Sequence, residues 1–199
     1  MQNIYLITHC EATHSVEKKV GGWYDSELTE HGRKQAEELE KIINERVDIN
    51  SLEIFSSDLK RAVQTAKIIR KEVHKIRLDP RLREMSFGTH EGLPQGQHLQ
   101  SMVPVSPDGN RLDHRICPGA ESRREVATRI DEFVEELINS GDDALIVTHG
   151  FAATFFIAAF QKIEVNSQGY LNYALNPGSL TLLKIDELFE NRTVAWIKN

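Results

Sequence analysis

Two short apolar runs in this chain each end in the dipeptide Thr-His, and this repetition constrains the fold more than any other feature. Residues 5–9 read Tyr-Leu-Ile-Thr-His, and residues 144–149 read Ala-Leu-Ile-Val-Thr-His. Continuous apolar runs of this length are typical of strands buried in a parallel sheet, and open α/β sheets bind ligands beyond the carboxyl ends of such strands. Each histidine taken alone would be read as structural. The pair predicts that His9 and His149 face one crevice.

Strands and helices alternate along most of the chain. Apolar residues at helical spacing predict helices at about 29–45, 59–69, 122–141 and 151–160. Apolar runs predict strands at about 3–8, 51–57, 76–79, 144–148, 179–185 and 193–197. Ser57 or Asp58 would cap the second helix, and Gly141 would end the third. We therefore expect one three-layer α/β domain over residues 1–199, with a mostly parallel sheet and helices on both faces.

The segment 81–118 differs in composition from the rest of the chain. It holds four of the six prolines and four glycines, and it shows little periodicity. We expect loop structure there, with a lid-like insertion at about 89–118 rather than a boundary between domains. A small basic cluster at Arg111, His114 and Arg115 would most often be a solvated loop. Alternatively, its arginines contact a substrate anion.

The charge balance restricts the partners of the protein. With 30 acidic and 24 basic residues the formal net charge is −6, which gives no global attraction to nucleic acid or an anionic membrane. No apolar run approaches the ~20 residues of a membrane-spanning helix, and the chain starts with a strand pattern rather than a targeting segment. Its two cysteines are too few for a disulfide framework. We expect a cytoplasmic protein; the sequence carries no signal for its oligomeric state.

Four chemically capable side chains follow strand ends in this layout: His9, Arg61, Glu84 and His149. Neutral imidazole can attack phosphorus, a guanidinium can bind two phosphate oxygens, and a carboxylic acid can protonate a leaving alkoxide. Together these groups predict phosphoryl transfer without a metal or another cofactor, acting on a small phosphorylated molecule.

Two further local features bear on this chemistry. Helix N-termini after Ser57 and Gly150 would direct backbone N–H groups at the same place, which favours an anion there. A zinc site at His9, Glu11 and His14 is a weaker alternative, because no Cys-x-x-Cys follows and the His-Glu-x-x-His order is absent.

A series of motifs runs in order along nearly the whole chain. They are His9 with Glu11, Gly22, Asp25, Leu28-Thr29, Gly32, Gln35-Ala36, Ser56-Ser57-Asp58-Leu59, Arg61-Ala62, Thr65-Ala66, Arg83-Glu84, Phe87-Gly88, Glu91-Gly92, Pro118-Gly119-Ala120-Glu121-Ser122 and Thr148-His149-Gly150. In order and spacing this series resembles the histidine phosphatase, or phosphoglycerate mutase-like, superfamily. The stretch at 82–88 resembles the phosphatase branch more than the glycolytic mutases.

The resemblance implies a role for each residue of the site. His9 would become a phosphohistidine, Arg61 and His149 would hold the phosphoryl oxygens, and Glu84 would donate a proton to the leaving group. The implied activity is metal-independent hydrolysis of a small phosphomonoester. Candidates for the rim of the substrate site are Glu11, Ser15, Gly22, Arg111, Arg115 and Gly150.

One departure from the family pattern concerns phosphate binding. Thr8 stands where the family places an arginine before the nucleophile, so that the phosphate would receive at most a neutral hydrogen bond from this position. A charge-assisted hydrogen bond contributes roughly 1.5 to 3 kcal/mol, and its loss predicts a rate about 10² to 10³ lower. The sequence thus leaves open a phosphatase and a catalytically weakened relative that binds a phosphorylated ligand. A phosphoglycerate mutase is a distant third possibility.

Overall fold

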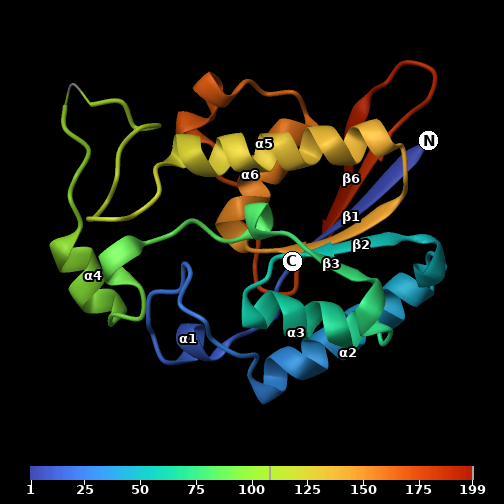
Figure 1. Cartoon of the computed structure of the whole chain (residues 1–199), viewed down its shortest axis with the longest axis horizontal. Coiled ribbons are helices and arrows are strands. Elements are labelled where there is room, and N and C mark those ends of the chain that lie inside the picture. Colours follow the sequence, from blue (N-terminus) through green and yellow to red (C-terminus); the bar gives the residue numbers. More distant parts are fainter. Residues whose placement is uncertain (108, 199) are drawn as a thin grey trace.

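The computed structural model describes residues 1–107 and 109–198, and its centre is a six-stranded sheet (Figure 1). The strands are β1 (Gln2–Thr8), β2 (Glu53–Ser56), β3 (Ile76–Leu78), β4 (Ala144–Thr148), β5 (Leu180–Ile185) and β6 (Arg192–Lys198). Their order is β3-β2-β4-β1-β5-β6. The first four strands in this order pair in parallel, while β5 and β6 are antiparallel. The expected mostly parallel sheet is confirmed.

Four main helices cover the two faces of the sheet. They are α2 (Glu30–Asn44), α3 (Lys60–Ile69), α5 (Arg123–Ser140) and α6 (Gly150–Phe160). Figure 1 shows α5 and α6 on one side of the strands and α2 with α3 on the other. Each face of the sheet has its own apolar core, because successive side chains of β1 point to opposite faces. Ile4 and Leu6 pack with α5 and α6, whereas Tyr5 and Ile7 pack with α2 and α3. No helix of the described chain combines the length and the apolar character needed to cross a membrane.

Several short elements were not expected from the sequence. They are α1 (Thr13–Val16), α4 (Gln95–Ser101) and 3₁₀ turns at Ile49–Ser51, Val73–Lys75, Pro80–Leu82, Gly88–His90 and Val165–Tyr170. The helix α4 lies within the segment predicted as loop. It has no buried residue, so its sequence lacks the apolar stripe by which a helix is recognised. The turn at Ile49–Ser51 also shortens the strand expected at 51–57.

The residues that cap the helices agree with the sequence-based predictions except at the start of α3. Ser122 and Glu125 form a reciprocal capping box at the start of α5, and Gly141 ends this helix with φ of 73°. The N-cap of α3 is Leu59 rather than Ser57 or Asp58. Ser57 instead accepts a hydrogen bond from the backbone N–H of Leu59 (3.3 Å), one residue before the helix.

The site is placed by the pairing of β1 with β4. These strands are parallel neighbours, and Thr8 pairs with Thr148 at their carboxyl ends. The chain therefore leaves both strands at the same edge of the sheet, with His9 and His149 as the next residues.

Candidate active site

The two histidines that follow β1 and β4 lie together at the edge of the sheet. Their ring centroids are 5.0 Å apart, and the rings meet edge to face. His9 is 8% exposed and His149 is fully buried. The fold thus brings the two histidines together at one edge of the sheet, as the sequence predicts.

The hydrogen bonds of His9 define its tautomer. Its Nδ1 lies 2.8 Å from the carbonyl oxygen of Cys10, which can only accept, so Nδ1 carries the proton. Its Nε2 accepts a hydrogen bond from Nε of Arg61 at 3.2 Å. Burial, and then the Arg61 charge, hold the pKa of His9 well below its usual value. The ring is therefore neutral at neutral pH, with the lone pair of a nucleophile on Nε2.

Arg61 is fixed from three directions although it is only 1% exposed. Besides His9, it donates to the carbonyl oxygens of Tyr24 (2.9 Å) and Gly22 (2.7 Å). Burial lowers the pKa of Arg61 to about 10, so the guanidinium stays charged at neutral pH. Gly22 has φ of +55°, and a Cβ there would meet a ring carbon of Phe87 at 2.8 Å. Gly22 thus serves the site through its backbone carbonyl.

The Glu84 carboxylate sits at the N-terminus of α6. It accepts hydrogen bonds from the backbone N–H groups of Phe151 (3.2 Å) and Ala152 (3.0 Å), and from that of Met85 (2.9 Å). Burial nevertheless raises the pKa of Glu84, against the lowering effects of these N–H groups and of Arg61. A raised pKa suits a carboxyl group that must give up a proton near neutral pH.

Two side chains hold the backbone of Glu84. Its carbonyl oxygen accepts from Nε1 of Trp23 (2.7 Å) and from Arg129 on α5 (3.0 Å). Arg129 also donates to the Arg83 carbonyl at 2.8 Å and pairs with Glu121 at 2.9 Å. The loop after β3 is thereby tied to α5. Arg129 was not among the site residues predicted from the sequence, because nothing local distinguishes it from the other arginines of this amphipathic helix.

His149 has one nitrogen without a partner. Its Nε2 lies 2.8 Å from Oγ of Ser57, whereas its buried Nδ1 has no hydrogen-bond partner among the described residues. Burial, followed by the charge of Arg61, holds the pKa of His149 well below its usual value. If the Ser57 hydroxyl donates to Nε2, the proton of His149 lies on Nδ1 and can be donated to a ligand.

The helix N-termini expected near the site already contact carboxylates. The N-terminus of α6 binds Glu84, and the first N–H of α3, at Lys60, donates to Asp25 at 2.9 Å. Their dipoles therefore stabilise protein carboxylates instead of standing open to a ligand.

The position of Thr8 does not fit the expected phosphate contact. Its hydroxyl donates to the carbonyl oxygen of Asn176 (2.6 Å) and accepts from the N–H of Ser179 (3.0 Å). The residue is only 2% exposed. Thr8 thus fastens the segment before β5, because its one O–H is already donated within the protein.

Three of the candidates for the rim of the substrate site have different surroundings. Glu11 accepts from the hydroxyl of Thr29 at 2.6 Å, in the N-cap of α2, and therefore supports that helix. Ser15 is exposed, with Oγ 3.3 Å from Nε2 of His14. Gly150 begins α6 directly after His149.

The two arginines of the insertion have different surroundings. Arg115 pairs with Glu125 at 2.6 Å and donates to the Ala120 carbonyl, so it supports the start of α5. Arg111 lines a cavity of about 360 Å³ together with Met85 and Phe151, the sequence neighbours of Glu84 and Gly150. Of these two arginines, only Arg111 lines the cavity.

Two further residues, His14 and Arg123, lie near the site. His14 lies 6.1 Å from His9 between ring centroids and bonds to Ser26 at 2.7 Å, and burial lowers its pKa to about 4. Arg123 is half-buried, with its guanidinium 4.7 Å from the centroid of the Phe151 ring.

Two further observations concern possible metal ligands and the thiol of Cys10. Among residues 1–107 and 109–198 no group of three or more His, Cys, Asp or Glu side chains could hold a metal ion. Cys10 is fully buried, and burial raises the pKa of its thiol to about 12. Its thiol is therefore protonated and inert at neutral pH.

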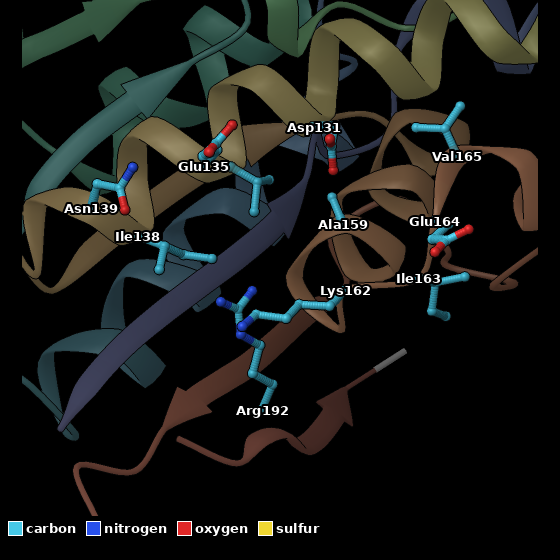
Figure 2. A pocket seen from close by; sticks show the side chains of 11 residues that line it. Asp131, Glu135, Ile138, Asn139, Ala159, Lys162, Ile163, Glu164, Val165 and Arg192 are labelled. Atoms are coloured by element: carbon cyan, nitrogen blue, oxygen red, sulfur yellow. The ribbon is translucent and has the colours of Figure 1, made fainter. Parts of the chain in front are cut away.

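A second hollow of about 440 Å³ lies away from this cluster. Figure 2 shows that Asp131 and Glu135 of α5 reach it from one side, and Lys162 and Arg192 from the other. It adjoins the carboxyl end of α6, whereas His149 precedes the opposite end. An 11-residue helix is about 16 Å long, so this hollow takes no part in the site.

Comparisons with known proteins converge on one group. The sequence model of the histidine phosphatase superfamily (branch 1) matches residues 4–196. The chain is 29% identical to a fructose-2,6-bisphosphatase of Saccharomyces cerevisiae, over 98% of this chain and 41% of the yeast protein. It is 32% identical to a glucosyl-3-phosphoglycerate phosphatase of Mycobacterium tuberculosis, over 82% of this chain and 77% of that protein. The solved structure of YhfR from Bacillus stearothermophilus is similar with a TM-score of 0.77 and 30% identity, over 98% of this chain and 96% of that chain.

Proposed function

This chain belongs to the histidine phosphatase superfamily, and from that membership and the geometry of the site we propose that it hydrolyses a small phosphomonoester through phosphorylated His9. One observation carries the proposal. The unprotonated Nε2 of His9 lies against Arg61, in a buried cluster with the unpartnered Nδ1 of His149 and a carboxyl group, Glu84, of raised pKa.

In the first step, Nε2 of His9 attacks the phosphorus and the bond from phosphorus to the ester oxygen breaks. Arg61 and Nδ1–H of His149 hold the phosphoryl oxygens, since each offers an N–H that is not used within the site. The carboxylic acid of Glu84 gives its proton to the departing alkoxide. The Cys10 carbonyl stabilises the ring, which now carries positive character, through its bond to Nδ1–H.

In the second step, water attacks the phosphorus of phosphohistidine. The Glu84 carboxylate takes the proton from this water, and the bond from phosphorus to Nε2 breaks. Inorganic phosphate leaves, and both His9 and Glu84 return to their starting protonation states. No step requires a metal ion, so activity should persist in the presence of a chelator.

The phosphohistidine can be trapped directly. With 4-nitrophenyl phosphate labelled at phosphorus, rapid quenching in alkaline denaturant should leave label on the protein that mild acid then releases. His9→Asn should carry no label and should not turn over. The matched control is His31→Asn, an exposed histidine of α2, which should keep both properties. Turnover without protein-bound label, or normal turnover by His9→Asn, would contradict the proposal.

The geometry of Thr8 favours a second candidate, a relative that binds a phosphorylated ligand and turns it over slowly. No cation reaches the site from position 8, because the Thr8 side chain is tied to Asn176 and Ser179. In that case Thr8→Arg should raise kcat/KM about tenfold or more, equivalent to about 1.4 kcal/mol of transition-state stabilisation. Thr8→Val, which removes the hydroxyl without adding charge, is the matched control and should give no gain. An efficient natural protein that Thr8→Arg leaves unimproved would exclude this candidate.

We also propose that the protein acts in the cytoplasm on a small phosphorylated molecule, with neither nucleic acid nor membrane as partner. The formal net charge of −6 supports the exclusion of nucleic acid and anionic membranes, since it gives no global attraction for either. Residues 89–118 would act as the lid of a single domain.

A further inference from the structure

Beside Glu84 lies an apolar cavity of about 360 Å³ that the proposed chemistry does not use. Met85 and Phe151 line it, and their backbone N–H groups are two of those that hold the Glu84 carboxylate. The ester oxygen of the substrate must approach Glu84 to receive its proton. The part of the substrate beyond that oxygen therefore extends toward this cavity.

Apolar residues of the insertion also line the cavity, and some of them are partly exposed to solvent. They are Met102, Val103, Pro104, Val105 and Ile116. Val103 is 50% exposed, and Met102 and Val105 are each 37% exposed. Apolar side chains gathered around a cavity next to catalytic groups are typical of a ligand-binding pocket.

The titratable side chains that line this cavity are all nitrogen bases. They are His98, Arg111, His114 and Arg123, and no described carboxylate lines it. Arg123 stacks on Phe151 and donates to the carbonyl oxygen of Leu171, while its buried Nε has no partner among the described residues. Arg111 stacks on Tyr170 and donates to the carbonyl oxygen of Gly169 at 3.0 Å.

The charges of these two arginines are not compensated. Their neighbours Arg115 and Arg124 pair with Glu125 (2.6 Å) and Asp113 (2.5 Å), whereas neither Arg111 nor Arg123 forms an ion pair within the described chain. The positive charge of Arg111 and burial both lower the pKa of Arg123, burial more strongly. Arg123 is half-buried and Arg111 is exposed. Two guanidinium groups without an ion-pair partner beside an apolar cavity favour an anion, because each can give it charge-assisted hydrogen bonds.

We propose that the substrate is a phosphomonoester whose alcohol part has an apolar body and a second anionic group that Arg111 and Arg123 bind. This inference rests on the proposed function for the placement of the phosphate at His9. The apolar body would fill the cavity between Phe151 and the insertion. The second anion would bridge the two guanidinium groups, which meet a carboxylate or a phosphate through paired N–H donors.

The test uses stable phosphonates, so that it does not depend on turnover. We would titrate benzylphosphonates that carry a para chain ending in a carboxylate, a second phosphonate or a neutral carboxamide, at two chain lengths. The natural protein should bind at least one anionic probe about tenfold or more tightly than its carboxamide analogue, and added salt should reduce this preference. Arg111→Met and Arg123→Met should each bring the ratio of the affinities for the anionic probe and its carboxamide analogue close to one. Arg124→Met, the adjacent arginine on the same helix, should retain it.

Substitution of Arg123 also removes its bond to Leu171, so a second variant guards against misfolding. Arg123→Lys keeps the charge without the planar fork and should retain part of the preference. Equal affinity of the natural protein for all three probe types would overturn the inference, as would a preference that survives both methionine substitutions. Labelling of His9 by an aryl phosphate that carries no second anionic group, in the same preparation, would show that the proposed function holds even then.

Discussion

At the scale of single residues, burial sets the protonation states that the chemistry needs. His9 and His149 are neutral because a buried imidazolium next to Arg61 would be costly. Burial raises the pKa of Glu84, because it disfavours the carboxylate anion. Burial therefore favours the unprotonated form of the base and the protonated form of the acid in one site.

The role of Glu84 can be tested with the leaving group. Glu84→Gln should lower kcat/KM for alkyl phosphates by about 10² to 10⁴, since the alkoxide then leaves without a proton. Activated aryl phosphates, whose phenolates leave unassisted, should be slowed far less. Equal slowing of both substrate types would remove Glu84 from this role.

The dependence of kcat/KM on pH, compared between the natural protein and Glu84→Gln, is a second test of Glu84. The natural protein needs Glu84 protonated and His9 unprotonated, so kcat/KM for an alkyl phosphate should fall as pH rises past the raised pKa of Glu84. Toward low pH the rate should hold in mild acid, because the pKa of His9 lies well below its usual value. Glu84→Gln should lack the alkaline limb.

At the scale of elements, the start of α5 joins the insertion to the site. Its capping box fixes Ser122, the next residue is Arg123 at the cavity, and Arg129 two turns later holds the loop that carries Glu84. One helix thus positions both the proposed acid and the proposed anion site.

We expect Ser122→Ala to lower the free energy of unfolding by about 1 kcal/mol, because the N–H of Glu125 loses its capping acceptor. Urea denaturation followed by circular dichroism would measure the change. Ser140→Ala at the other end of α5 is the matched control. Exposed Ser140 donates to a carbonyl within the last turn and accepts one long hydrogen bond (3.3 Å) from the exposed N–H of Asp142, so its effect should stay within about 0.5 kcal/mol. A loss for Ser122→Ala no larger than that of the control would show that the box does not stabilise the helix.

At the scale of the whole molecule, the buried histidines link stability to pH. In the unfolded chain they bind protons as pH falls below about 6.5, whereas in the folded chain their lowered pKa values keep them neutral. The free energy of unfolding should therefore decrease with falling pH in this range, by about 1.4 kcal/mol per pH unit for each such histidine. Above that range both states are neutral and the effect vanishes.

His149→Gln isolates one of these contributions. Between about pH 6 and pH 5 the free energy of unfolding of this variant should fall less steeply with acidification than that of the natural protein, by roughly 1 kcal/mol per pH unit. His31→Asn should leave the slope unchanged, because His31 is exposed in the folded chain as well. An unchanged slope in His149→Gln would mean that His149 accepts a proton in the folded state.

The sequence by itself determined the elements and the order of the catalytic side chains. The apolar runs before His9 and His149 mark β1 and β4, and parallel pairing then brings both residues to one edge of the sheet. The spacing of apolar residues after Leu59 places Arg61 in the first turn of α3. Such features depend on residues a few positions apart, and a local pattern therefore predicts them.

Tertiary structure alone decided which atoms of these residues are free to react. The hydroxyl of Thr8 is taken by Asn176, far along the chain, and no property of the local sequence at position 8 indicates this. Glu84 meets the N-terminus of α6, and Arg123 turns inward because Phe151 offers an aromatic face. These contacts join segments separated by tens of residues or more, and their geometry is set by how the loops and layers pack.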